Sequence, residues 1–258
     1  MWILQAELLV AAAVSSLLFA VFVLPPSEAA DNAPVSWDGG GDGLNWTDCQ
    51  NWTADTCPAI DANVTLVPGS DVDLDSSVIL KGSRLTISSG ATLNVLSGIS
   101  LRDDSRDSIL SNDGTIVISP SAKVYWSGLL NNNAEGSINN RGIFESCGHT
   151  INDGTINNKP AASFAVECGS AFENAGRFYN FGTFINAKEA NLENLGTFIN
   201  AAEFDNHAVF RNGGLFRSNG TLTNDAGSNF ISGACATFVN SGTLVGGPIQ
   251  SGSGSCGQ

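Results

Sequence analysis

The sequence predicts an all-β protein, a single-stack β-solenoid (parallel β-helix) with three strands in each coil of about 20 residues. Three observations predict this fold. A large apolar residue recurs every six or eight residues over 164–244. A small residue stands two positions before it, and an Asn commonly stands two positions after it. Apolar residues that are three repeats apart in this series are separated by 18 to 22 positions. A helix would instead need apolar residues three and four positions apart.

The period of two in a strand places the small residue, the apolar residue and the Asn on one face. Taking every third repeat gives three interior columns: Phe164, Phe184, Phe204, Leu222 and Leu244; Phe172, Leu192, Phe210 and Phe230; Phe178, Phe198, Phe216 and Phe238. Successive coils would hydrogen-bond at about 4.8 Å, and the Asn side chains would form amide ladders. The small residue would leave room for the Phe ring, and the eight-residue steps would be corner insertions.

Residues 1–29 are predicted to be a signal peptide, because an apolar run over 8–24 precedes a small-x-small cleavage site. The segment before this run lacks Lys and Arg and contains Glu7. A retained N-terminal anchor is therefore the alternative. In both cases we expect the rest of the chain to be secreted or displayed at the cell surface. No later segment is apolar enough to span a bilayer.

Residues 30–60 are expected to form an N-terminal cap, because the end of a solenoid exposes strand edges that must be covered. The segment is rich in Trp and contains two cysteines: Trp37, Trp46, Trp52, Cys49 and Cys57. Residues 61–248 are expected to form one solenoid of roughly nine coils, less regular over 61–158. Residues 249–258 are a Gly/Ser-rich tail, and no apolar C-terminal cap is visible.

The chain is acidic, with a formal net charge of −14 among 258 residues. A polyanion binds nucleic acid and anionic membranes poorly. We therefore expect no nucleic-acid partner and, after signal cleavage, no membrane partner. Cations, neutral polymers and other copies of the chain remain as partners.

An even number of cysteines in an exported chain suggests disulfides, although six cysteines allow 15 pairings. Cys147 and Cys168 are 21 residues apart, as are Cys235 and Cys256, which is about one coil. Each pair could therefore bridge neighbouring coils. With the cap pair, this predicts Cys49–Cys57, Cys147–Cys168 and Cys235–Cys256. An intermolecular bond is the alternative for Cys256.

The stretch "SWDGGGDGLNWTDCQNWTADTCPAIDANVTL" over 36–66 and the later "GTFIN" repeats carry a family resemblance. The chain resembles prokaryotic cell-surface β-helix proteins of the haemagglutinin or autotransporter-passenger type. The resemblance implies a right-handed β-helix displayed at a cell surface. The chain shows no translocator barrel and has paired cysteines, which departs from that pattern and favours a secreted subunit over an adhesin arm.

Two acidic groups are the candidates for chemistry: Asp71, Asp73 and Asp75 on one strand face, and Asp103, Asp104 and Asp107 beside Arg102 and Arg106. Carboxylates on a solenoid face can bind Ca²⁺ or hydrolyse glycosides. The spacing is loose, so a solvated acidic face is the preferred interpretation. His149 and His207 are isolated in the sequence, and nothing near them orients either as a base. We expect no catalytic residue, cofactor or metal.

Four Asn-x-Thr sequons start at Asn45, Asn51, Asn63 and Asn219. They are possible glycosylation sites only in a source that glycosylates exported proteins. Sequons are also expected by chance in so Asn-rich a chain.

The expected function is structural and non-enzymatic. A rigid, disulfide-stapled solenoid would be a subunit of a surface fibre, sheath or layer. It would form homo-oligomers or filaments, with head-to-tail assembly as one arrangement. The alternative is a secreted β-helix that binds or cleaves carbohydrate, with cell-surface polysaccharide as its partner. Ice binding is a third, minor alternative. It usually requires flat ranks of Thr on an outward face, and Thr recurs too irregularly here.

Overall fold

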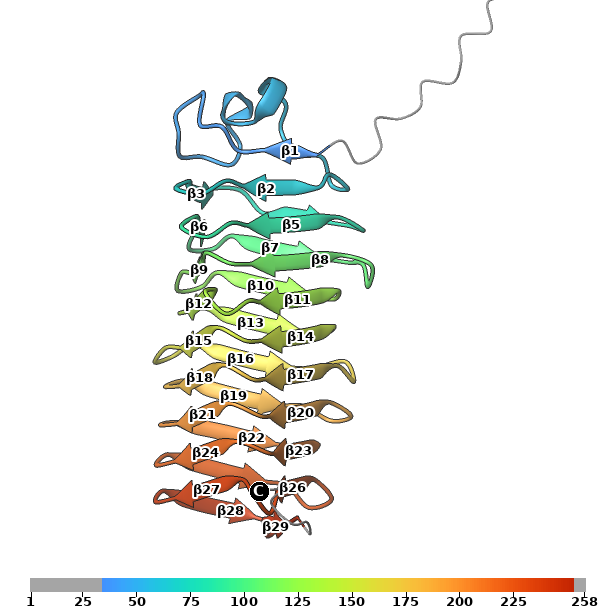
Figure 1. The fold of residues 1–258 in the computed structure, drawn as a ribbon, viewed down its shortest axis with the longest axis vertical. Coiled ribbons are helices and arrows are strands. Elements are labelled where there is room, and N and C mark those ends of the chain that lie inside the picture. The colour runs from blue at the N-terminus through green and yellow to red at the C-terminus, as the bar shows by residue number, and fades with distance from the viewer. Residues whose placement is uncertain (1–33, 253–258) are drawn as a thin grey trace, which may run out of the picture. The chain divides into compact units, whose positions relative to one another are not determined.

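The computed structural model describes residues 34–252, a stack of parallel strands with three strands in each coil (Figure 1). The predicted signal peptide, residues 1–29, lies outside the described residues. Two of the three sheets contain nine strands and the third contains eleven. The predicted all-β solenoid with three strands per coil is therefore confirmed. Every pairing between named strands is parallel, for example Phe164 with Phe184 and Phe184 with Phe204.

From β2 onward the strands alternate strictly among the three sheets, whereas β1 and β2 both belong to sheet 1. Sheet 1 contains β1 (Val35–Ser36), β2 (Val64–Leu66), β5 (Arg84–Ile87), β8 (Ile109–Asn112), β11 (Leu129–Asn132), β14 (His149–Asn152), β17 (Ala171–Asn174), β20 (Asn191–Asn194), β23 (Val209–Asn212), β26 (Asn229–Ser232) and β29 (Gln250–Ser251). Sheet 2 contains β3 (Asp71–Leu74), β6 (Thr92–Val95), β9 (Thr115–Ile118), β12 (Ser137–Asn140), β15 (Thr155–Asn158), β18 (Arg177–Asn180), β21 (Thr197–Asn200), β24 (Leu215–Ser218) and β27 (Thr237–Asn240). Sheet 3 contains β4 (Val78–Leu80), β7 (Ser100–Asp103), β10 (Lys123–Trp126), β13 (Ile143–Ser146), β16 (Ser163–Val166), β19 (Thr183–Asn186), β22 (Glu203–Asn206), β25 (Thr221–Asn224) and β28 (Thr243–Gly246).

The apolar residues stack into the three predicted interior columns. In sheet 2, Phe178, Phe198 and Phe216 occupy the same register in successive coils. The rings of Phe178 and Phe198 are parallel, with centroids 4.7 Å apart, which is the spacing of the strands themselves. Rings from different sheets meet edge to face, as Phe178 and Phe184 do at 5.1 Å. The interior is thus filled by side chains, and one coil alone could not bury them.

Buried Asn side chains form the predicted amide ladders inside the corners. Asn158 accepts a hydrogen bond from the Asn140 amide at 2.9 Å and donates to Asn180 at 2.8 Å. Every rung donates toward the following coil, so the first rung of a ladder has no amide donor before it. The side-chain oxygens of Asn112 and Asn186, which begin two of the three ladders, have no hydrogen-bond partner. All side-chain amides of a ladder therefore point in the same direction along the stack.

The small residue before each strand has a different role from the one expected. Gly154, Gly176, Gly196 and Gly214 lie in register in successive coils. A Cβ at Gly196 would come closer than 3.0 Å to the carbonyl oxygen of Gly176, one coil earlier. That oxygen accepts the hydrogen bond from the backbone N–H of Thr197 at 2.9 Å. The backbone of the preceding coil, and not the Phe ring, excludes a side chain at this corner.

The cap contains β1 and two short 3₁₀ helices, η1 (Cys49–Asn51) and η2 (Thr53–Asp55). Trp52 is fully buried, and its ring contacts those of Trp37 and Trp46 edge to face at 5.0 and 4.7 Å. This aromatic cluster lies beside the first coil, with which β1 pairs through β2. At the other end, β29 lies within the expected Gly/Ser-rich tail 249–258, so the solenoid extends past residue 248.

Candidate functional site

The glycine-rich turn of the cap is organised around Asp42. Its carboxylate accepts hydrogen bonds from the backbone N–H groups of Asn45 and Leu44, both at 2.9 Å, and from the side-chain amide of Asn51 at 2.7 Å. The bond from the Asn45 backbone, with those from Asn51 and Leu44, lowers the pKa of Asp42 well below its ordinary value of 3.8. The carboxylate is engaged with its own loop and holds the cap in shape.

Asp71, Asp73 and Asp75 point outward from the first coil, as predicted, but they are engaged in structural hydrogen bonds. The Asn94 amide donates to Asp71 at 2.8 Å and to Asp73 at 3.0 Å. Asp75 accepts a hydrogen bond from the backbone N–H of Thr47 at 3.1 Å. Asp75 therefore ties the cap to the first coil, and the other two carboxylates share one amide of the next coil.

The second acidic group is not a single exposed cluster, contrary to expectation. Asp103 is fully buried, because it is the last inward position of β7. Its carboxylate accepts hydrogen bonds from the N–H groups of Ser105 at 3.0 Å, Ser127 at 3.1 Å and Gly128 at 2.8 Å. It takes the inward place that Asn occupies in later coils and holds together two neighbouring corners.

Only Asp104 and Asp107 remain on the surface of that group. Asp104 forms an ion pair with Arg102, and this partner raises the pKa of the guanidinium. Arg102 also lies over the ring of Tyr125, with 5.0 Å between the guanidinium carbon and the ring centroid. This outward arrangement of an aromatic ring, a cation and a carboxylate is a surface that a sugar could contact.

A notch opens at the corner between sheets 3 and 1. The corners at 127–128 and 147–148 are short, whereas those at 104–108 and 167–170 are longer and project on either side of them. The resulting notch has a volume of about 490 Å³, with Arg106, Cys147, Cys168 and His149 among its lining residues. A guanidinium and an imidazole on its walls suit a small anionic or hydroxyl-bearing group.

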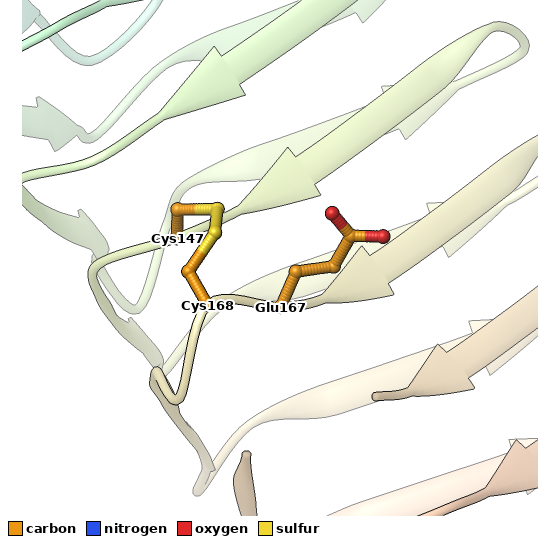
Figure 2. A group of neighbouring side chains, drawn as sticks. All are labelled: Cys147, Glu167 and Cys168. Atoms are coloured by element: carbon orange, nitrogen blue, oxygen red, sulfur yellow. A yellow bond between two sulfur atoms is a disulfide. The ribbon is translucent and has the colours of Figure 1, made fainter. Parts of the chain in front are cut away.

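A disulfide joins Cys147 to Cys168 across this notch and so links two neighbouring coils (Figure 2). Glu167 lies beside it, and one oxygen of its carboxylate is within 4.8 Å of both sulfur atoms. Because the two sulfur atoms are bonded to each other, they are not thiolate ligands for a metal ion. A second disulfide joins Cys49 to Cys57 in the cap. Cys235 is also disulfide-bonded, and its predicted partner Cys256 lies outside the described residues.

Both histidines have acidic neighbours, which corrects the expectation that nothing orients them. His149 Nε2 lies 3.0 Å from Glu173, and His207 Nδ1 lies 2.6 Å from Asp225. Each acid belongs to the following coil, so the approximate coil length could have identified both pairs from the sequence. The four side chains are exposed, and such pairs contribute little to stability.

The four sequons differ in accessibility. Asn51 is fully buried and its side chain holds the cap turn, so the folded cap does not offer it to a glycosylating enzyme. Asn45 and Asn63 are half-buried, and Asn219 is exposed at a corner.

Comparison with protein-family models, with curated proteins and with solved structures finds no match to this chain. Within residues 34–252, no helix is both long and apolar enough to cross a bilayer. The notch is a feature that the sequence does not predict, whereas the lack of an apolar C-terminal cap was expected from the sequence. Corner lengths, readable from the eight-residue steps, could have indicated the notch.

Proposed function

We propose that this chain is a non-enzymatic extracellular structural protein, a rigid β-solenoid subunit of a surface fibre, sheath or layer. The observation that carries the proposal is the filled interior. Phe172, Phe184, Phe198 and Phe210 are fully buried along the stack, and buried amide ladders follow the same path. Such a stack resists bending because each coil contacts its neighbours through backbone, ring and amide bonds at once.

The carboxylates support this reading. Asp42, Asp73, Asp75 and Asp103 each accept hydrogen bonds that hold the cap or join coils. A typical glycoside hydrolase needs a pair of carboxylates that face the substrate and are free to exchange protons. The disulfides are consistent with an oxidising compartment and therefore with export. The resemblance to surface β-helix proteins of the haemagglutinin or autotransporter-passenger type agrees with display outside the cell.

Immunogold electron microscopy of the producing cells tests the structural role. We expect gold particles on a surface layer or on extracellular fibres, and loss of that material when the gene is deleted. Label that remains inside the cell, or surface material unchanged by the deletion, would refute the proposal.

Carbohydrate binding is the second candidate, because Tyr125, Arg102 and Asp104 form an outward aromatic and charged surface. Aromatic rings beside polar groups are common in specific binding sites. Binding and cleavage screens on surface polysaccharides test this candidate. Asp104→Ala should weaken any binding there, with Asp73→Ala as the matched control on another sheet. Cleavage that Asp73→Ala or Asp104→Ala abolishes would instead favour an enzyme.

A further inference from the structure

The C-terminal end of the solenoid leaves interior side chains exposed. Leu244 belongs to the column of Phe184, Phe204 and Leu222, which are fully buried, yet 44% of Leu244 is exposed. Phe238, which continues another column, is only partly buried. The strands β27, β28 and β29 end their sheets, so each pairs with a neighbour on one side only. Within residues 34–252, this end presents both apolar side chains and a free strand edge.

The same end carries no charge. From Ala226 to Gly252 the chain contains no Asp, Glu, Lys, Arg or His, although its overall net charge is −14. Exposed strand edges in soluble proteins are usually protected by charged side chains. Two copies of so acidic a chain would repel each other across most of their surface. An uncharged end is the place where two copies can meet without that repulsion.

The N-terminal end is different, because the cap reaches the first strand of every sheet. β1 pairs with β2, the backbone N–H of Trp46 donates to Asp73 in β3, and the N–H of Lys81, after β4, donates to Ile60. The cap is also acidic: between residues 34 and 63 it has five Asp and no Lys or Arg. β1 is the end strand of its sheet, but its outer edge is occupied by the cap itself, because the Ser36 N–H donates to the Thr53 hydroxyl at 3.1 Å and Trp37 forms a bridge with Trp52. The cap therefore offers neither a free strand edge nor a neutral surface to the C-terminal end of another copy.

We propose that the C-terminal coil is a self-association surface and that two copies of this chain meet through it tail to tail. A two-fold axis perpendicular to the solenoid makes such a contact isologous, and it brings the end strands together antiparallel. Leu244 and Phe238 of the two copies then close each other's interior columns. The proposed contact depends on the proposed structural role only for its biological purpose. A tail-to-tail pair would be twice as long as one subunit and would carry an acidic cap at each end.

The size of the end face sets the expected affinity. A four-residue strand spans only about 13 Å. Three such strands cover less than the roughly 800 Å² per partner of a standard interface. We therefore expect a reversible dimer that dissociates in the micromolar range. Because the contact itself is uncharged but both copies are acidic, high salt should not weaken the dimer and should slightly favour it by screening the repulsion between the copies.

Sedimentation velocity over a concentration series, on the full chain as secreted by an expression host, tests the contact. Leu244→Glu places two carboxylates against each other at the symmetric contact and should weaken dimerisation at least about tenfold. Leu195→Glu is the matched control, because Leu195 is also exposed, at 54%, but lies on the corner between β20 and β21, two coils before the corresponding corner of the end coil. A chain that stays monomeric at every concentration, or equal effects of the two variants, overturns the proposal.

Pulsed electron spin resonance on nitroxide-labelled chains distinguishes the orientation. Thr243→Cys places a label on the end coil and Thr221→Cys places it in register one coil earlier. No described cysteine is free to take the label. In a tail-to-tail pair, moving the label back one coil lengthens the distance by up to about 10 Å, twice the strand spacing.

A head-to-tail chain would leave the label distance unchanged and would grow beyond dimers, which overturns the tail-to-tail contact while leaving the structural role intact. If the chain's own last residues cover the end, the wild type is monomeric and removal of 253–258 creates the dimer. That result also overturns the proposal. Immunogold labelling of cells does not depend on either outcome, so failure of the structural role is recognised separately.

Discussion

Replacing one rung of an amide ladder should cost far more stability than replacing the Asn beside it. Asn158 is fully buried, whereas its neighbour Asn157 points outward and is half-buried. The Asn158 side chain takes part in three hydrogen bonds, with Asn140 at 2.9 Å, Asn180 at 2.8 Å and the carbonyl oxygen of Thr183 at 2.8 Å. Asn158→Ala removes all three and leaves their partner groups buried inside the stack.

The expected magnitude follows from these bonds. A net contribution of about 1 kcal/mol for each gives about 3 kcal/mol, and buried groups left unpaired add further cost. Asn157 donates one half-exposed hydrogen bond, to Asn139 at 3.1 Å, so Asn157→Ala should cost no more than about 1 kcal/mol. The two variants delete the same atoms from adjacent positions of β15.

Equilibrium unfolding in guanidinium chloride, followed by circular dichroism of the strands, measures both changes. The disulfides should be kept intact so that wild type and variants share the same cross-links. Solenoids can unfold coil by coil, so fluorescence of the Trp residues provides a second probe of cooperativity. If Asn158→Ala and Asn157→Ala shift the free energy of unfolding equally, the ladder contributes no more than a surface hydrogen bond and the reasoning is wrong.

Three further predictions concern the corners, the disulfide and the cap. Gly214→Ala should lower the melting temperature clearly, because its Cβ would meet backbone of the preceding coil, whereas Gly213→Ala would meet only the end of an exposed side chain and should change it little. Joint replacement of Cys147 and Cys168 by Ser should lower the free energy of unfolding in guanidinium by about 3 kcal/mol. The reason is that the bond closes a loop with a sequence separation of 21 and so reduces the entropy of the unfolded chain. The lowered pKa of Asp42 means that its stabilising effect is present above pH 3.8 and is lost as pH falls below that value. A urea titration of cap fluorescence over this range should show the acid-side loss in wild type and a weaker pH dependence in Asp42→Asn.

The fold could be predicted because the interior repeats with the coil. Phe164, Phe184 and Phe204 stand 20 residues apart, and the structure places them in one register. A strand period of two then fixes which residues face inward. The first coils follow the same geometry with mixed aliphatic side chains. In these coils only the alternation of apolar and polar residues and the turn residues indicate the strands. The spacing therefore does not give the register of each strand.

The side chains outside the repeat were harder to place. Asp103 was grouped with Asp104 and Asp107 because the three are close in sequence, but strand alternation turns Asp103 inward and leaves Asp104 outside. The sequence identifies such an inward residue only when the register of the coil is known. Asp103 occupies the inward position at the end of its strand, where the later repeats have Asn. The pairing of His149 with Glu173 likewise depends on a register between coils.

The contrast between interior and exterior bears on where recognition can occur. In sheet 2 the first inward positions of β15, β18 and β21 are Ile156, Phe178 and Phe198, all apolar and buried, and the second inward position of each is a ladder Asn. The outward positions beside them change from Thr155 to Arg177 within one coil. A partner that makes the same contact in every coil would need outward side chains that are the same in every coil. Contacts along the sides are therefore expected to be local, whereas the C-terminal end offers the same uncharged strand edge on every copy. This makes the C-terminal end the better place for a specific assembly contact.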